Sequence, residues 1–324
     1  MTETKERKQN MLKIGNKEFE KLVGMAPLAG ITDSSFRKII KERGCQFSFT
    51  EMVSAKGIYY KDPKTEELLH IDPEEGLVGA QIFGRDSEIL SKVIKENLNH
   101  REDIFSIDLN MGCPAPKVVK NGDGSALMKE PETAERIINA MVESSTKPVS
   151  VKFRLGWDEE NINFLEIGKI CEKAGVSFVT LHPRTRKAFY AGKADWDSIK
   201  ILKEELSIPV MGNGDLFSKE DIEKMFRHTL CDGVFVGRGA LQNPNIFGEG
   251  ESLSLQKIVE LIKKHYSLKI AQKGERRAIP EMRKHIAWYL KGVPNSNPLK
   301  NKINTENNLQ TIFKLLEEFE REQE

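Results

Sequence analysis

The sequence predicts an α/β fold, a (β/α)8 TIM barrel followed by a small C-terminal helical domain. Eight short apolar segments recur between Leu22 and Gly239, and charged amphipathic stretches separate them. This strand–helix alternation is typical of a (β/α)8 barrel, and it stops after Gly239. An open doubly wound sheet is the alternative, but the turn after the first segment, APLAGITD, lacks the GxGxxG pattern of dinucleotide-binding sheets.

The eight apolar segments are the predicted strands, because continuous runs of Val, Ile, Leu and Phe indicate burial on both faces of a parallel sheet. They are LVGMAP (22–27), QFSFTEM (46–52), LVGAQIFG (77–84), IFSIDLNMG (104–112), PVSVKFRLG (148–156), SFVTLHPR (177–184), IPVMGNGD (208–215) and GVFVGRG (233–239). Stretches such as DSEILSKVIKENLNH and NFLEIGKICEKAG predict the intervening helices.

The pattern changes beyond the last strand. A linker rich in Pro, Asn and Gly precedes three predicted helices, and a break at GVPNSNP separates the last two. The helices are expected at about 254–272, 279–291 and 305–321, with the break at 292–298. We therefore expect an N-terminal tail (1–14), a catalytic barrel (15–250) and a helical domain (251–324).

Composition narrows the class of protein. No apolar run is long enough to span a bilayer, and no secretory signal follows the charged N-terminus, so we expect a cytoplasmic protein without a membrane partner. The four cysteines are widely spaced and form no CxxC pair, which argues against a metal site and against disulfides. Net charge is only +1, but residues 257–302 hold twelve Lys and Arg against three Glu, a local charge of +9. This suits a polyanion such as nucleic acid, although a solvated helix surface also explains it.

Polar residues follow the predicted strands where an apolar core would otherwise be expected. Active sites of such barrels lie at the C-terminal ends of the strands, so these side chains should meet at one mouth. In chain order they are Thr32, Asp33, Glu51, Gln81, Asn110, Gly112, Cys113, Lys152, Arg154, His182, Arg184, Arg186, Asn213, Gly214, Asp215, Gly237 and Arg238.

Three features of this set indicate ligand binding or catalysis. The turns MGNGDL and VGRGAL follow strands seven and eight, where barrels commonly bind phosphate through backbone N–H groups. Cys113 lies between Gly112 and Pro114 on a loop over the mouth, whereas the other cysteines fit a structural role. Lys152 lies within an apolar strand, so it could face a flavin or form a Schiff base, and His182 could be functional or a strand cap.

The ordered motifs carry a family resemblance. APLAGITD, TEM, NMGCPAPKV, GSALM, VKFRLGW, LHPRTR, YAGKADW, NGD and VGRGAL occur in one order, and MRKHIAWYLKG follows at 282–292. Over roughly residues 15–293 this set resembles the tRNA-dihydrouridine synthases, closest to the bacterial B-type.

The resemblance implies FMN, NADPH (or NADH) as reductant, and uridine in the D-loop region of tRNA as substrate. Cys113 would be the catalytic acid and Asn110 would lie beside both flavin and uracil. The remaining cofactor-binding residues would be Pro27, Leu28, Ala29, Gln81, Lys152, His182, Asn213, Gly214, Asp215, Gly237 and Arg238. A thiol with a pKa near ~8.5 is mostly protonated at neutral pH, which suits proton donation to C5 of uracil.

Positive and aromatic residues are the expected tRNA contacts. At the barrel mouth they are Arg154, Arg184, Arg186 and Lys187, and in the helical domain they are Arg277, Arg283, Lys284, His285, Trp288 and Lys291. Arg277, Lys284, Trp288 and Lys291 share one helix face by their spacing, with smaller contributions expected from Arg283 and His285. Ile279, Met282, Ile286 and Tyr289 should pack the opposite face.

Three other functions explain part of the pattern. A flavin enzyme for free pyrimidines, similar to dihydroorotate dehydrogenase, accounts for the barrel site but not for the basic segment. A Schiff-base aldolase would use Lys152 and no flavin. A non-catalytic tRNA-binding barrel leaves Cys113 and Lys152 unexplained. The uridine position and the oligomeric state have no signature in the sequence.

Overall fold

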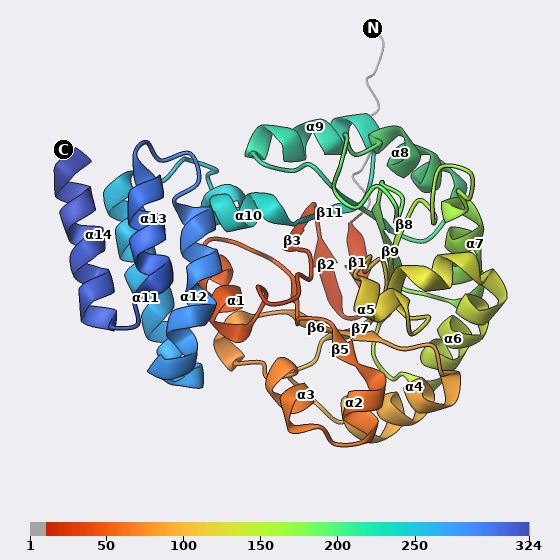
Figure 1. Ribbon diagram of the computed structural model, residues 1–324. Coiled ribbons are helices and arrows are strands. Elements are labelled where there is room, and N and C mark those ends of the chain that lie inside the picture. The colour runs from red at the N-terminus through yellow and green to blue at the C-terminus, as the bar shows by residue number, and fades with distance from the viewer. Residues whose placement is uncertain (1–10, 324) are drawn as a thin grey trace, which may run out of the picture.

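The barrel dominates the structure, a computed structural model that describes residues 11–323 (Figure 1). Its parallel strands follow the order β3-β11-β10-β9-β8-β7-β6-β4, and the short β5 (Val53–Ser54) pairs with β6. The eight strands are β3 (Leu22–Met25), β4 (Ser48–Phe49), β6 (Val78–Phe83), β7 (Ser106–Met111), β8 (Val149–Arg154), β9 (Phe178–His182), β10 (Val210–Asn213) and β11 (Gly233–Val236). Each lies within one predicted segment, so the (β/α)8 prediction is confirmed.

Two backbone hydrogen bonds join the first and last strands of that order. The amide of Met25 donates to the Phe47 carbonyl at 2.8 Å, and the amide of Gln46 donates to the Val23 carbonyl at 3.2 Å. The register across the sheet then places Asn110 opposite Lys152, and Arg154 opposite His182. Residues far apart in sequence therefore reach the same end of the barrel.

Helices surround the barrel, as Figure 1 shows. The outer helices are α1 (Ser34–Lys41), α4 (Ser87–Val93), α6 (Pro131–Ser144), α7 (Phe164–Ala174), α8 (Trp196–Glu205), α9 (Lys219–Thr229) and α10 (Arg238–Gln242). Shorter helices α2 (Ala55–Tyr59), α3 (Pro63–Leu68) and α5 (Pro116–Val119) lie in the connections that follow β5 and β7. Their apolar faces and the outer faces of the strands form one buried cluster.

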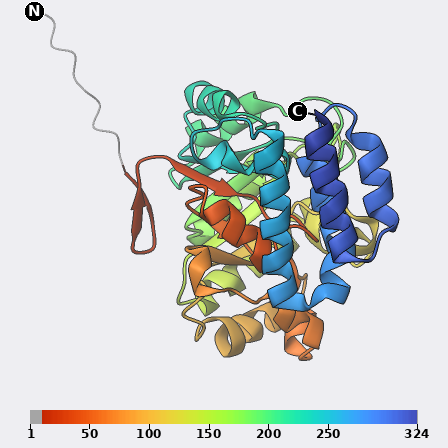
Figure 2. The same ribbon diagram turned by 90° about the vertical axis from the view of Figure 1, so that its left-hand side faces the viewer.

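An antiparallel hairpin closes one end of the barrel (Figure 2). Its strands are β1 (Leu12–Ile14) and β2 (Lys17–Phe19), and Leu12, Ile14 and Phe19 are buried with aromatic side chains of the barrel interior. The boundary expected after residue 14 falls in this hairpin, so the predicted tail is wrong for its last residues; 1–10 lie outside the described residues. Three-residue strands are too short to show a period in the sequence.

The C-terminal helices form a bundle beside the barrel, and we refer to α11–α14 as the helical bundle (Figure 1). They are α11 (Leu255–Lys273), α12 (Glu275–Tyr289), α13 (Ser296–Thr305) and α14 (Leu309–Gln323). Ile279, Met282, Ile286 and Tyr289 are buried, as their spacing predicts. None of the helices among residues 11–323 is long and apolar enough to cross a membrane.

Helix α13 was not predicted, because its first turn lies inside the expected break at 292–298. Pro298 suggested a loop, but proline is compatible with the first turn of a helix, where its missing N–H would have no partner. Helix α12 begins at Glu275 rather than at the expected residue 279, and Pro280 lies inside it, beyond the first turn. A proline inside a helix removes one backbone hydrogen bond, which is why the sequence placed the start of the helix next to Pro280.

Candidate active site

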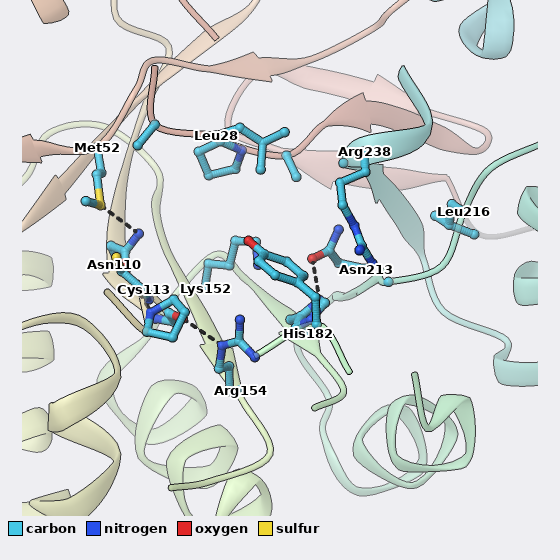
Figure 3. A pocket seen from close by; sticks show the side chains of 18 of the residues that line it. Leu28, Met52, Asn110, Cys113, Lys152, Arg154, His182, Asn213, Leu216 and Arg238 are labelled. Carbon is cyan, nitrogen blue, oxygen red and sulfur yellow. Dashed lines mark hydrogen bonds between the residues drawn. The ribbon is translucent and has the colours of Figure 1, made fainter. Parts of the chain in front are cut away.

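A pocket opens at the C-terminal ends of the strands (Figure 3). Its empty space is about 900 Å³ including the open mouth, and both polar and apolar side chains line it. Fourteen residues to which the sequence assigned a catalytic, cofactor-binding or RNA-binding role line it: Pro27, Leu28, Ala29, Gln81, Asn110, Cys113, Lys152, Arg154, His182, Asn213, Gly214, Asp215, Gly237 and Arg238. The parallel topology thus brings the predicted catalytic and cofactor-binding residues together.

A chain of buried hydrogen bonds supports the loop that carries Cys113. The Asp108 carboxylate accepts from Ser150 Oγ at 2.6 Å and from Gln81 Nε2 at 2.7 Å. Gln81 Oε1 accepts from Asn110 Nδ2 at 2.7 Å, and Asn110 Oδ1 accepts from the amides of Gly112 (3.1 Å) and Cys113 (2.9 Å). These partners orient both amide side chains, so the loop position is fixed from the centre of the barrel.

The Cys113 thiol lies at the pocket surface in its protonated form. Burial raises its pKa, and the nearby Arg154 lowers it by less. Arg154 itself holds the loop, since Nε donates to the Gly112 carbonyl at 2.7 Å and Nη1 donates to the carbonyls of Thr185 (3.0 Å) and Phe189 (2.8 Å). The thiol can therefore keep a proton near neutral pH in a fixed position.

Lys152 is a half-buried amine beside Cys113 and Arg154 (Figure 3). Burial and then the charge of Arg154 lower its pKa to about 8, while Asp108 opposes the shift. Within residues 11–323 no hydrogen bond or salt bridge engages its amino group. Such a cation inside a pocket is available for an electron-rich or anionic group of a ligand.

His182 presents an unpartnered nitrogen in the same pocket. Asn213 Nδ2 donates to the Phe235 carbonyl at 2.6 Å, so Asn213 Oδ1 faces His182 Nδ1 at 3.1 Å and accepts its proton. Burial first, and then Lys152 and the two arginines Arg154 and Arg184, hold the His182 pKa well below its usual value. The neutral ring leaves Nε2 as a buried acceptor without a partner among the described residues, which fits a ligand donor.

Strands β10 and β11 end in a charged rim. Asp215, at φ +53°, accepts from Arg184 Nη2 at 2.7 Å and from Arg238 Nη2 at 3.3 Å. A Cβ added to Gly237 would meet no atom within 4 Å, so the space next to this backbone is open. The Arg238 guanidinium lies 4.6 Å from the centre of the Tyr190 ring. Unobstructed space beside a glycine backbone, next to an arginine guanidinium, is suited to bind an anionic phosphate group.

Several lining residues were assigned no catalytic, cofactor-binding or RNA-binding role from the sequence. They are Ala26, Met52, Gly112, Pro114, Tyr190, Leu216, Phe217 and Gly239. Met52 and Tyr190 lie in the motifs TEM and YAGKADW, and Gly112 and Gly239 adjoin predicted residues, so motif membership was a usable signal. Phe217 has no such signal, since only the fold places it beside Arg238, 5.6 Å from guanidinium to ring centre.

The expected tRNA-contacting residues at the barrel mouth divide into buried and accessible ones. Arg184 is buried and donates to Asp215 and to the Ala191 and Gly192 carbonyls. It therefore stabilises the loop that contains these two carbonyls and does not face solvent. Arg186 is half-buried and Lys187 is exposed, and Lys187 pairs with Asp158 at 2.7 Å.

The helical bundle requires corrections to the expected contacts. His285 is fully buried against His265, with ring centroids 4.4 Å apart, so its assignment as an RNA contact is wrong. Arg277 forms two hydrogen bonds to the Glu67 carboxylate of α3, at 2.6 and 2.9 Å, and Arg283 donates to the Glu306 carbonyl at 3.1 Å. Side chains that were expected to face RNA thus connect parts of the protein.

The local charge of +9 in residues 257–302 is partly compensated. Five of its twelve cations face carboxylates: Lys263 with Glu317, Lys264 with Glu42, Lys269 with Asp33, Lys273 with Glu281, and Arg277 with Glu67. Lys284, Trp288 and Lys291 remain on the predicted face, and the Lys291 amino group lies 4.8 Å from the Trp288 ring centre. The accessible basic surface is therefore smaller than composition alone indicates.

Comparison with known proteins assigns the family. The family model "Dihydrouridine synthase (Dus)" matches residues 24–324. The chain belongs to the dihydrouridine synthase family. It is 38% identical over 292 residues to "tRNA-dihydrouridine synthase B" of Pasteurella multocida, covering 87% of each chain. It is 36% identical over 322 residues to "Probable tRNA-dihydrouridine synthase" of Rickettsia conorii, covering 95% of this chain and 96% of that protein. This dihydrouridine synthase homologue is therefore an oxidoreductase, and the aldolase and non-catalytic alternatives are wrong.

Solved structures support the barrel fold of this dihydrouridine synthase homologue. Histamine dehydrogenase from Rhizobium sp. 4-9 matches with a TM-score of 0.51 at 14% identity, covering 80% of this chain and 50% of that chain. The TcOYE structure with pHBA matches with a TM-score of 0.50 at 10% identity, covering 82% and 97%. At these identities the likeness concerns the fold alone.

Proposed function

We propose that this enzyme is a tRNA-dihydrouridine synthase that binds FMN in the barrel pocket and uses NADPH to reduce the C5=C6 bond of uridines in the D-loop region of tRNA. The observation that carries the proposal is the protonated Cys113 thiol, which shares one pocket with the unpaired Lys152 and the orphaned His182 Nε2. Relatives named as tRNA-dihydrouridine synthases over nearly the full chain support the substrate.

The residues present fit FMN. Pro27, Leu28 and Ala29 offer a largely apolar wall for the flavin ring, and Lys152 and His182 offer polar partners along its edge. The rim at Asn213, Gly214, Asp215, Gly237 and Arg238 would hold the ribityl chain and phosphate. When bound and reduced, FMN would supply the hydride that C6 of uracil receives. NADPH fills the role of reductant in the proposal, and NADH would serve the same chemistry.

The chain itself must supply the proton for C5. Cys113 holds it on Sγ, and Asn110 and Arg154 fix the loop so that the thiol stays at the pocket mouth. The target uridine has to leave its stack to enter, as in other base-modifying enzymes. The groups proposed to hold the RNA around it are the exposed Lys187 and Lys291 and the half-buried Arg186, Lys284 and Trp288.

The test is to measure the two half-reactions separately in Cys113→Ala. We expect the variant to bind FMN and to oxidise NADPH like the parent, while reduction of uridine in unmodified tRNA falls by about 10²- to 10⁴-fold, the usual effect of removing a positioned acid. Cys45→Ala is the matched control, since burial raises the Cys45 pKa to about 12 and this thiol lies outside the pocket. Equal loss of both half-reactions in Cys113→Ala would contradict the acid role.

The same assay separates the substrates. Unmodified tRNA and free uridine or orotate are offered to the parent enzyme with NADPH in excess. We expect dihydrouridine in tRNA and no turnover of the free pyrimidines. Turnover of a free pyrimidine without modification of tRNA would instead favour the enzyme class similar to dihydroorotate dehydrogenase.

A further inference from the structure

The loop that follows β3 forms one wall of the pocket and ends at the helical bundle. Pro27, Leu28 and Ala29 line the pocket, and Asp33 ends the loop as the N-cap of α1. Asp33 Oδ1 accepts from the Phe36 amide at 3.1 Å, which ties the start of the helix to this carboxylate. The position of Asp33 therefore sets where the pocket loop joins the rest of the fold.

Helix α11 holds Asp33 through a buried salt bridge. The Lys269 ammonium group contacts Asp33 Oδ2; Lys269 is fully buried and Asp33 is 6% exposed. Lys273, one turn further along α11, lies 3.7 Å from the same oxygen. Burial by itself would raise the Asp33 pKa, but Lys269 and the neighbouring polar groups lower it below its usual value, so the carboxylate stays charged. The pair joins the pocket loop to a helix 236 residues away in sequence.

A relay of neutral groups joins the same carboxylate to α12. Ser35 Oγ donates to Asp33 Oδ1 at 2.7 Å, so its oxygen accepts from His265 Nε2 at 3.1 Å. His265 Nδ1 is then the acceptor for the Tyr289 hydroxyl at 3.0 Å. Burial lowers the His265 pKa to about 3, so the ring remains neutral and the relay keeps one direction of hydrogen bonding. Both oxygens of Asp33 are thus engaged with the helical bundle.

An outer ring of charges encloses this contact. Lys273 lies 3.0 Å from Glu281 and 3.4 Å from Glu67, and Glu67 also binds Arg277 at 2.6 Å. Together with Asp33 and Lys269 they make three cations and three carboxylates, so the cluster is neutral. Its ion pairs join residues of α3, α11, α12 and the pocket loop.

The barrel anchors the same loop at other points. The Gly30 amide donates to Glu51 Oε2, and Arg37 Nη1 donates to the Thr32 carbonyl at 2.5 Å. Those bonds fix the loop to the barrel, and Asp33 fixes it to the helical bundle, whose Lys284 amino group also lies beside Gly30. The cluster is thus placed to transmit the position of the bundle to the pocket wall.

We propose that Asp33 and Lys269 are positioning residues that join the helical bundle to the wall of the cofactor pocket. Through this pair, the position of α11 against the barrel determines the position of the loop that carries Pro27, Leu28 and Ala29. This inference rests on the proposed function, because it takes the occupant of the pocket to be FMN. It gives the helical bundle a second role besides contact with RNA. Arg277, which sequence patterns assign to RNA, belongs to this contact.

The experiment compares FMN affinity with thermal stability in three variants. Asp33→Asn keeps the helix cap but loses the charge, Lys269→Met keeps the packing but loses the charge, and the double variant removes both. FMN dissociation constants are measured on the flavin-free protein by quenching of flavin fluorescence, well below the unfolding temperature of each variant. Lys264→Met is the matched control, because Lys264 also joins α11 to α1 but pairs with Glu42, the C-cap of α1, at the opposite end of that helix from Asp33.

Both single variants should lower the unfolding temperature, because each removes the closest partner of a buried charge. In Asp33→Asn, Lys269 keeps only Glu281 at 3.5 Å, and in Lys269→Met, Asp33 keeps only Lys273 at 3.7 Å. Both should also raise the FMN dissociation constant by about 5- to 150-fold, the usual range of coupling between two sites. The double variant has no unpaired charge, so its unfolding temperature should recover while its FMN affinity stays weak. Lys264→Met should leave FMN affinity unchanged.

Two results would overturn the inference. One is an FMN affinity that follows the unfolding temperature and recovers in the double variant, which would make the pair merely structural. The other is parental FMN affinity in all three variants. If the parent itself binds no FMN, the proposed function fails first, so the two failures are distinguishable.

Discussion

Replacing Asp108 by Asn should remove a pH dependence of stability that the barrel centre creates. Burial raises the pKa of Asp108 to about 7, and the hydrogen bonds from Gln81 and Ser150 and the charge of Lys152 oppose this without cancelling it. An unfolded Asp titrates near ~3.9, so the folded protein holds a proton that the unfolded chain has already released. Stability from this group is present at acid pH and is lost as pH rises toward the folded pKa.

The magnitude follows from the two pKa values. From about pH 5 to about pH 7 the unfolding free energy of the parent should fall by about 2 kcal/mol relative to that of Asp108→Asn. The reason is that the folded carboxyl keeps its proton while the unfolded one has released it. Asn can replace the neutral acid, because its oxygen accepts from Gln81 and its amide can donate to Ser150 Oγ. Lys152, whose pKa is lowered to about 8, and the Cys171 thiol, whose pKa is raised by burial, titrate above this window.

The assay is urea unfolding of the ligand-free protein at several pH values in that window. We expect the unfolding free energy of Asp108→Asn to gain about 2 kcal/mol on that of the parent between about pH 5 and about pH 7. The buried histidines His182, His265 and His285, whose pKa values burial lowers, contribute the same pH dependence to both proteins. Asp103→Asn is the control: burial would raise the Asp103 pKa, but Arg101 lowers it, so its contribution is lost only at more acid pH. Parallel profiles for the parent and Asp108→Asn would refute the reasoning and would mean that Asp108 is ionised throughout, paired with the Lys152 cation.

Two other predictions concern the loop over the pocket and the RNA surface. Asn110→Ala leaves the Gly112 and Cys113 amides without their acceptor, which should lower the unfolding free energy by about 1–3 kcal/mol. Uridine reduction should slow more than NADPH oxidation does. Equal slowing of the two half-reactions in stopped-flow measurements would contradict this. The double variant Lys284→Met, Lys291→Met should weaken tRNA binding and lower its salt dependence by up to ~0.9 log unit per lost phosphate contact. Arg277→Gln, which breaks the pair with Glu67, should mainly lower the unfolding temperature. If only Arg277→Gln changed the salt dependence of tRNA binding, these assignments would be reversed.

The sequence by itself determined the barrel and most of its pocket. Continuous apolar strands leave a strong local signal, and β6 and β7 match their predicted segments closely. Parallel strands all end at one mouth, so knowing that Asn110, Lys152 and His182 end strands was enough to predict that they meet. Cys113 stood out because it lies in a loop between Gly112 and Pro114, where a structural cysteine is not expected.

Only the tertiary structure decided how the charges of the C-terminal segment are used. Lys269 and Asp33 lie 236 positions apart, and Arg277 and Glu67 lie 210 apart. The spacing of residues along a helix therefore cannot predict either pair. Composition counts both cations as surface charge. In the fold Lys269 is buried in a salt bridge, and the half-buried Glu67 carboxylate pairs with Arg277. His285 shows the same limit, because it follows Lys284 in the chain but points to the opposite side of α12, into the protein. Periodicity locates the faces of a helix, but what packs against each face depends on long-range contacts that the chain makes only once it has folded.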